Sequence, residues 1–339
     1  MALPALLQNR LTVPVVGSPM FIISNPDLVI AQCKAGIVGS FPALNARSTE
    51  MLDSWLARIT GELAGHDARH PERPAAPFAV NQIVHKSNVR LEADLAVLAK
   101  YRAPIVITSL GAREDVNAAV HGWGGIVLHD VINNMYAKKA VQKGADGLIA
   151  VAAGAGGHAG THSPFALLQE IREWFDGPLL LSGAIASGNA ILAAQAAGAD
   201  LAYMGSAFIA TPEANAADAY KQMIVEGGAA DIVFTNLFSG VHGNYLRPSI
   251  VNAGLDPDNL PQPEAPSMNF SSGGNGRPKA WKDIWGAGQG IGAVKSVVPA
   301  AELVARLREE YRQARRRLAI DGEAGADART EVGTLAPAD

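Results

Sequence analysis

Short apolar runs alternate with amphipathic segments along the first 210 or so residues of the chain. Eight of these runs are rich in Val, Ile and Leu and lack a strict apolar–polar alternation, which is typical of parallel strands buried on both faces. They span 13–20, 37–41, 78–83, 104–109, 125–129, 147–152, 178–182 and 201–205. Eight strand–helix units in about 200 residues predict a (β/α)8 barrel of the α/β class. An open, doubly wound sheet is the alternative architecture.

The segments between the runs repeat apolar residues at helical spacing, so each of the first seven runs is followed by a predicted helix. These helices span 26–35, 49–64, 88–100, 113–121, 134–143, 164–175 and 187–197. Two of them end in the same Gly-Ala-Asp turn, at Gly144 and Gly198, where glycine suits the position just after a helix. The repeated turn indicates structurally equivalent units.

The regular alternation stops after residue 211, and this change divides the chain. Residues 1–211 and 280–318 are expected to form the barrel and a closing C-terminal segment, with 212–279 inserted as a lid or substrate segment. The lid contains a predicted helix at 213–226, a short apolar stretch at 231–238 and a proline-rich loop. Residues 299–318 predict a basic amphipathic helix, whereas the small, polar and acidic residues 319–339 are typical of a disordered tail.

Composition narrows the class of protein further. The chain has 339 residues, 48% of them hydrophobic, so it can bury a large core. Its net charge of −4 argues against nucleic-acid and membrane-surface partners. Cys33 is the single cysteine, which excludes a disulfide framework and a cysteine-built metal site and favours a cytoplasmic protein. No metal site is expected, and the sequence leaves a homo-oligomer open.

Candidate site residues follow from the predicted strand ends, because barrel enzymes bind their ligands at the carboxyl ends of the strands. Ser182 and Gly183 follow the seventh strand, and Gly205 and Ser206 follow the eighth, where barrels often bind phosphate. Two ordinary glycine turns are the alternative. The other strand-end residues are Ser18, Pro19, Met20, Asn81, Gln82, His129 and Asp130.

The glycine-rich loop 154–160 after the sixth strand surrounds one titratable residue, His158. Small neighbours would let a planar ligand approach this imidazole, which could act as a general base near neutral pH. A flexible turn with a solvated histidine is the alternative. The loop also fits a relaxed dinucleotide fingerprint, but Pro164 indicates that the next helix begins too late for that fold. His242 has no partner in the sequence, and Tyr203 is expected in the core.

Several of these motifs, taken in order, resemble the nitronate monooxygenase family, formerly called 2-nitropropane dioxygenases. They are Gly17-Ser18-Pro19-Met20, Phe78-Ala79-Val80-Asn81, Gly156-Gly157-His158-Ala159-Gly160, Leu181-Ser182-Gly183-Ala184, Met204-Gly205-Ser206-Ala207-Phe208 and Trp285-Gly286-Ala287-Gly288-Gln289. The resemblance implies an FMN-dependent barrel with His158 as the active-site histidine. It implies that Pro19, Met20 and Asn81 line the flavin, that Ser182, Gly183, Gly205 and Ser206 hold the phosphate, and that Gly288 and Gln289 close over the cofactor. His129 and Gly157 are also expected near the flavin.

The implied reaction is the oxidation of a small anion such as an alkyl nitronate by O2, giving a carbonyl compound and nitrite. Two alternatives remain open. One is an FMN-dependent reductase that uses NAD(P)H with a quinone or enoyl-thioester acceptor, and the other is a flavin-free lyase or isomerase of a phosphorylated substrate. The chain also departs from the family, because Asp130 stands where many members have lysine, and Ala152-Ala153-Gly154 lacks their acidic residue.

Overall fold

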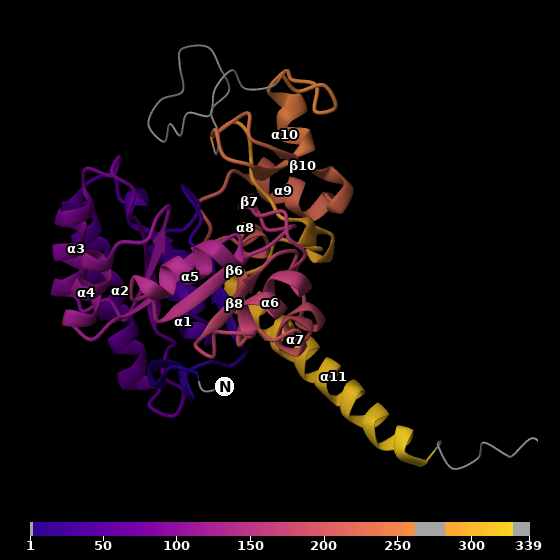
Figure 1. Ribbon diagram of the computed structural model, residues 1–339, viewed down its shortest axis with the longest axis horizontal. Coiled ribbons are helices and arrows are strands. Elements are labelled where there is room, and N and C mark those ends of the chain that lie inside the picture. Colours follow the sequence, from indigo (N-terminus) through magenta and orange to yellow (C-terminus); the bar gives the residue numbers. More distant parts are fainter. Residues whose placement is uncertain (1–2, 262–281, 328–339) are drawn as a thin grey trace, which may run out of the picture.

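The computed structural model of the protein describes residues 3–261 and 282–327, and its centre is a barrel of eight parallel strands (Figure 1). The strands are β1 (Val15–Gly17), β2 (Gly39–Pro42), β3 (Phe78–Ile83), β4 (Ile105–Ser109), β5 (Ile126–Val131), β6 (Gly147–Val151), β8 (Leu179–Ser182) and β9 (Leu201–Met204). Their order around the sheet is β1-β9-β8-β6-β5-β4-β3-β2. A parallel bridge between Val16 and Val38 joins β1 to the start of β2 and closes the sheet. The predicted barrel is therefore confirmed over the open sheet.

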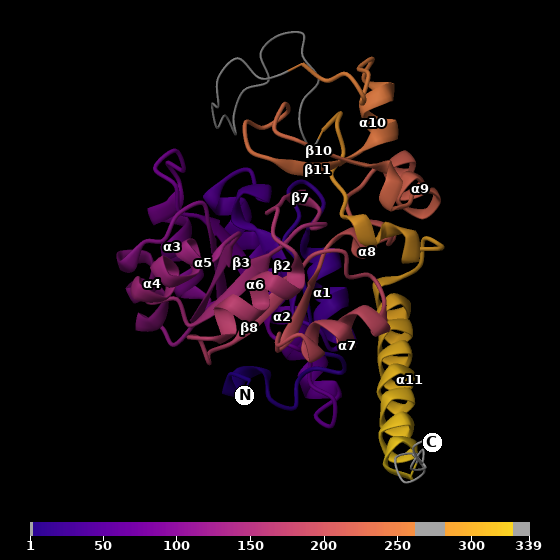
Figure 2. The same ribbon diagram turned by 45° about the vertical axis from the view of Figure 1, so that its right-hand side comes forward.

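Seven helices surround the barrel, each after one strand, as the apolar spacing predicted (Figure 2). They are α1 (Pro26–Ala35), α2 (Thr49–Arg69), α3 (Leu91–Lys100), α4 (Glu114–Gly122), α5 (Asn134–Gln142), α6 (Pro164–Arg172) and α7 (Gly188–Ala196). The side chains of Asn25, Ser48, Asn133 and Ser187 each accept a hydrogen bond from a backbone N–H in the first turn of α1, α2, α5 and α7. These N-caps fix where four of the helices begin.

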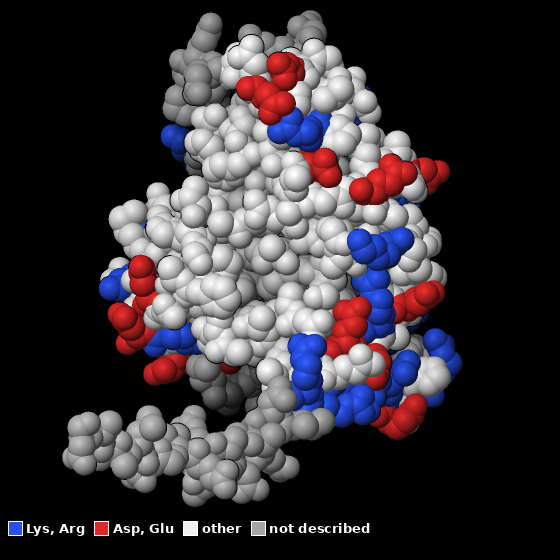
Figure 3. Space-filling view, turned by 90° about the vertical axis from the view of Figure 1, so that its right-hand side faces the viewer, with Lys and Arg blue, Asp and Glu red and all other residues white. Residues whose placement is uncertain are grey.

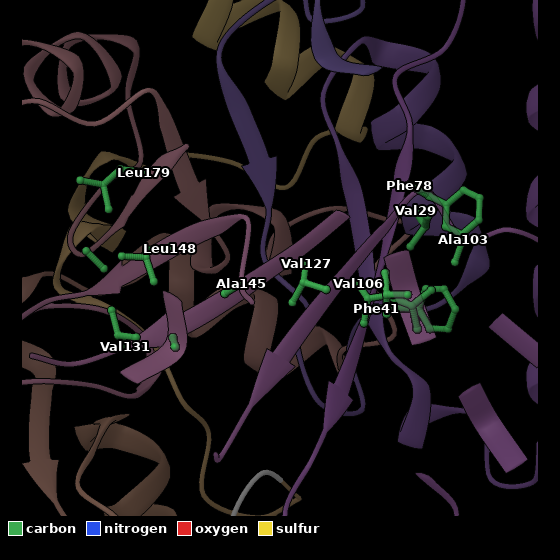
Figure 4. Packing of buried hydrophobic residues seen from close by; sticks show 14 of the residues in the cluster. Val29, Phe41, Phe78, Ala103, Val106, Val127, Val131, Ala145, Leu148 and Leu179 are labelled. Atoms are coloured by element: carbon green, nitrogen blue, oxygen red, sulfur yellow. The ribbon is translucent and has the colours of Figure 1, made fainter. Parts of the chain in front are cut away.

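Alternate residues of each strand pack in two different cores. Ala79, Ile107 and Leu128 belong to the cluster inside the barrel. Their neighbours Val80, Val106 and Val127 pack outward against the helices, where Phe41 and Phe78 also lie (Figure 4). Because side chains alternate along a strand, a shift of one residue moves a side chain from the barrel interior to the helix layer.

The last helix, α11 (Ala300–Asp327), takes the place of the eighth barrel helix. It packs against α1 and α7, with Leu303 and Leu307 buried and the Tyr311 hydroxyl bonded to Gln195. The helix continues beyond the predicted end at 318, so the expected disorder of 319–327 is wrong; 328–339 lie outside the described residues. Its far end projects past the barrel, and charged side chains of both signs gather along it (Figures 2 and 3).

The segment between β9 and α11 lies over the carboxyl ends of the barrel strands (Figure 2). It contains α8 (Ser206–Ile209), α9 (Asp218–Glu226), β10 (Ile232–Thr235), β11 (Gly243–Leu246) and α10 (Arg247–Asn252). The remaining short elements are β7 (Gly157–His158) and the 3-10 helices η1 (Ala5–Leu7), η2 (Ala43–Asn45), η3 (Ala229–Asp231) and η4 (Gln289–Ala293). Much of the proline-rich loop, 262–281, lies outside the described residues. Within the described residues, none of the helices combines the length and apolarity needed to cross a membrane.

Candidate functional site

A pocket of about 280 Å³, partly open to solvent, lies where β6, β8 and β9 end. The side chains and backbone of Ser182, Gly183, Gly205, Ser206 and Gly288 all line it. The pocket thus brings together the four residues predicted to hold a phosphate and one residue predicted to close over it. The rest of its lining is Gly154, Ala155, Gly156, Ala184, Ile185, Ala186, Tyr203 and Gly290, and no described lining residue is charged.

Glycines let three backbone segments meet at this pocket. A Cβ on Gly156 would lie 2.8 Å from Gly288 N and 2.9 Å from Ser206 Oγ. Gly288 N donates to Ser206 Oγ over 2.9 Å, and Gln289 N donates to Gly154 O over 2.9 Å. The segment containing Gly288 and Gln289 is therefore tied directly to the loop after β6 and to the start of α8.

The loop after β1 approaches the same pocket. A Cβ on Gly205 would lie 2.4 Å from Ser18 Oγ and 3.4 Å from Met20 Sδ, so Met20 lies beside the pocket. Met20 N donates to Ser24 Oγ and Met20 O accepts from Asn45 Nδ2, which holds the loop in place. Pro19, which precedes Met20, is half-buried. Pro19 and Met20 do not themselves line the pocket.

A chain of polar side chains crosses the inner face of three neighbouring strands. Asn81 Nδ2 on β3 donates to Ser109 Oγ on β4 over 2.7 Å, and Ser109 Oγ donates to Asp130 Oδ2 on β5 over 2.6 Å. Asp130 forms no ion pair with any described residue, and burial raises its pKa to about 6. The pKa of Tyr203, which lines the pocket, is raised by its own burial and by the charge of Asp130. Sequence reasoning had placed Tyr203 in the core and had not singled out Ser109.

His129 does not face this opening, so its predicted place beside a flavin is wrong. Val127 and Val131, on the same side of β5, pack in the outer core, whereas Leu128 packs inside the barrel. The His129 ring therefore lies between the sheet and the helices, where it is 5% exposed and its Nδ1 is 2.6 Å from Thr108 Oγ1. Burial lowers the pKa of His129 to about 4. The inward position on β5 belongs to Asp130.

His158 lies on β7, in a sheet that the sequence did not predict. Gly157 and His158 pair antiparallel with Asn244 and Gly243 of β11, and β11 pairs in turn with β10. His158 Nε2 is 2.8 Å from Ser239 Oγ of the lid segment, and burial lowers the His158 pKa to about 4. Gly157 adopts a positive φ of 70° at this pairing and does not line the pocket. A two-residue strand has no periodic signal, so only the glycine and histidine pattern pointed to this position.

The lid segment is attached to the site by buried contacts. Asn244 is 3% exposed, and its Nδ2 donates to Ala155 O in the loop after β6 over 2.6 Å. Asn244 O accepts from Ala287 N, just before Gly288. Tyr220 of α9 stacks on Trp285 and bonds to Gly286 O. The lid, the histidine strand and the closing segment therefore form one packed unit over the mouth.

These residues fit a flat cofactor that carries a phosphate. Glycines at 156 and 205 leave room that a Cβ would fill, and the hydroxyls of Ser182 and Ser206 face the same pocket. Backbone N–H groups and hydroxyls of this kind bind phosphate without a cationic side chain. The described residues contain no cluster of three or more His, Cys, Asp or Glu side chains that could hold a metal ion.

A mouth of this construction places the protein among the (β/α)8-barrel enzymes, whose sites lie at the carboxyl ends of the strands. A family model described as nitronate monooxygenase matches residues 5–310. A nitronate monooxygenase from Paraburkholderia phytofirmans is 28% identical, over 88% of this chain and 92% of its own. The chain therefore belongs to the nitronate monooxygenase family, and it is an oxidoreductase.

Two further similarities bear on fold and function. The structure of a nitroalkane oxidase from Streptomyces ansochromogenes matches with a TM-score of 0.72 and 24% identity, over 93% of this chain and 100% of its own, which supports the barrel fold. A Rhodococcus jostii protein named (3aS,4S,5R,7aS)-5-hydroxy-7a-methyl-1-oxo-octahydro-1H-indene-4-carboxyl-CoA dehydrogenase is 26% identical, over 71% of this chain and 64% of its own. The relatives thus include more than one kind of oxidoreductase.

Proposed function

We propose that this protein is an FMN-dependent nitronate monooxygenase that oxidises small alkyl nitronates, or the parent nitroalkanes, with O2 to carbonyl compounds and nitrite. The observation that carries the proposal is the junction of two functions in one loop. Residues 154–156 line the phosphate-sized pocket, and His158 follows two residues later on the strand that the lid holds. A cofactor bound by this loop would have the histidine beside it.

In this proposal Ser182, Gly183, Gly205 and Ser206 hold the FMN phosphate, while Gly288 and Gln289 close over it. Pro19, Met20 and Asn81 contribute to the surface that faces the ring. When bound, FMN would supply the electron-transfer chemistry between the substrate and O2. The protein orients both partners and excludes water through the packed lid.

His158 is the residue we assign to the substrate. Because burial lowers its pKa to about 4, the imidazole is neutral near pH 7 and has a lone pair available for a proton. The α-carbon of a nitroalkane would lose its proton to this lone pair. The electron pair of the C–H bond would move to the nitro group, giving the nitronate and an imidazolium.

The assignment is tested with His158→Asn, with His242→Asn as the matched control. His242 also belongs to the lid, but its ring stacks on Phe234 and only its backbone O contacts the histidine loop. Loss of a general base typically costs on the order of 10²–10⁴-fold in rate, so His158→Asn should lose nitroethane turnover by that factor. His242→Asn should stay within about twofold, as expected for a residue outside the site. Unchanged turnover of nitroethane and ethyl nitronate in His158→Asn would show that the assignment is wrong.

A second candidate is an FMN-dependent reductase that takes hydride from NAD(P)H and passes it to an enoyl thioester or quinone. The similarity to the Rhodococcus carboxyl-CoA dehydrogenase favours keeping it. Absorbance of the purified, FMN-loaded protein under anaerobic conditions separates the two functions. Bleaching by ethyl nitronate but not by NADH supports the monooxygenase, and rapid bleaching by NADH alone supports the reductase. A protein that fails to bind FMN would contradict both.

A further inference from the structure

We propose that Ser239, supplied by the lid, is a positioning residue that fixes His158 as the tautomer protonated on Nε2, so that Nδ1 is the proton-accepting atom. The inference deepens the proposed function, and it rests on that function only for its kinetic consequence. The tautomer itself is a property of the folded chain.

The argument begins with the single hydrogen of the Ser239 hydroxyl. Ser239 Oγ lies 3.1 Å from Val241 O, and a carbonyl oxygen can only accept, so this contact uses the hydroxyl hydrogen. Ser239 Oγ also lies 2.8 Å from His158 Nε2. Since the hydroxyl hydrogen is already committed, Nε2 must donate to Ser239 Oγ. A neutral imidazole has one N–H, so the lone pair falls on Nδ1.

A third contact completes the bonding of the same hydroxyl. The Tyr245 OH lies 3.2 Å from Ser239 Oγ and can donate to it. The hydroxyl then accepts two hydrogen bonds, from Nε2 and from Tyr245, and donates one to Val241 O, which is the full capacity of a serine side chain. Tyr245 is fully buried on β11, the strand that pairs with β7, and its ring packs edge-on against Phe238.

Protonation does not blur the tautomer near neutral pH. Burial lowers the His158 pKa to about 4, so the ring carries one hydrogen at pH 7. The side chains that face His158 and Ser239 from the packed lid elements are Tyr245, whose pKa is raised by burial, and His242. Asp130 is the nearest buried carboxyl described on the barrel side, and its own bond runs to Ser109.

The consequence is that a lid residue outside the barrel determines which nitrogen of His158 meets the substrate. With Nε2 held on the lid, the opposite edge of the ring presents Nδ1 for proton transfer. Loss of the serine would let the two tautomers exchange. It would therefore slow proton abstraction from a nitroalkane but not the oxidation of a nitronate, which has already lost that proton.

The test is ¹⁵N NMR of the full chain labelled on its histidines, with the His158 signals assigned from their absence in His158→Gln. In the natural protein at pH 7, Nε2 should give the shift of a protonated nitrogen and Nδ1 that of an unprotonated one. Ser239→Ala should move both shifts toward an exchange average, and Ser239→Thr, which keeps the hydroxyl, should restore them. A protonated Nδ1 in the natural protein, or unchanged shifts in Ser239→Ala, would overturn the proposal.

Kinetics supply the second arm. In Ser239→Ala, kcat for nitroethane should fall about threefold to tenfold with KM unchanged, because fewer molecules hold the reactive tautomer. Turnover of ethyl nitronate should stay within about twofold, since it needs no proton abstraction. An equal loss with both substrates would overturn the kinetic role. If His158→Asn were fully active while the NMR result held, the proposed function would fail and the tautomer assignment would stand.

Discussion

Ser109 Oγ donates to Asp130 Oδ2 over 2.6 Å on the inner face of the barrel, while Thr108 and His129, one residue earlier on the same two strands, contact each other on the outer face. The two pairs share strands and register but face different surroundings. The inner pair lies at the mouth with Asn81 and near Tyr203, whereas the outer pair is enclosed by helices. Only the inner pair can influence a ligand at the mouth.

Asp130→Asn should change how stability depends on pH. Burial raises the folded-state pKa of Asp130 from 3.8 to about 6, so the folded protein binds a proton that the unfolded chain releases between these values. The stability that this proton provides is present below pH 3.8 and is lost as pH rises through about 6. Relative to Asp130→Asn, the natural protein should lose about 1–3 kcal/mol of unfolding free energy between pH 4 and pH 7.5.

Urea unfolding at a series of pH values measures this difference directly. Asp258→Asn is the control, because the pKa of exposed Asp258 is lowered by Arg247 and its small effect should have the opposite sign. If the curves of the natural protein and Asp130→Asn ran parallel from pH 4 to pH 7.5, the raised pKa would be wrong.

His129→Leu should affect stability but not cofactor affinity. It leaves the buried Thr108 hydroxyl without its partner, which typically costs about 1–3 kcal/mol. The dissociation constant for FMN should remain within about twofold, since the ring lies on the outer face of β5. The double variant His129→Leu with Thr108→Val should regain part of the stability, because both polar groups are then removed. A large loss of FMN affinity in His129→Leu would place this histidine back in the site.

The error over His129 shows how far the sequence could lead. The apolar runs, helix spacing and strand ends predicted the barrel and the pocket at Ser182, Gly183, Gly205 and Ser206, because buried parallel strands have a strong local signal. The facing of His129 against Asp130 depends on a one-residue register, and strand ends cannot be located that closely from sequence. Likewise, Ser239 reaches His158 only through pairing of β7 with β11, which lie far apart in the chain.

The pH dependence of nitroethane turnover should reflect the low pKa of His158. An unburied histidine would give an acid limb near its usual pKa of about 6.5, whereas burial lowers the pKa of this residue to about 4. Neutral imidazole is the reactive form, so kcat/KM should stay level as pH falls from 7.5 to about 5 and decline only as pH approaches 4. Circular dichroism at each pH verifies that the protein remains folded. An acid limb centred near 6.5 would contradict the burial of the ring in the working enzyme.

Gly156→Ala should weaken FMN binding, because the added Cβ would lie 2.8 Å from Gly288 N and 2.9 Å from Ser206 Oγ. The neighbouring backbone cannot move aside without breaking the bond from Gly288 N to Ser206 Oγ. We expect the FMN dissociation constant to rise about tenfold or more, which corresponds to at least about 1.4 kcal/mol. Gly61→Ala is the matched control, since Gly61 lies in α2 with open space around it. That variant should bind FMN normally and gain about 0.5–1 kcal/mol of stability from helix propensity. Equilibrium titration of the apoprotein with FMN, followed by flavin fluorescence, measures both variants, and equal affinities would show that the segment at Gly288 does not form part of the cofactor site.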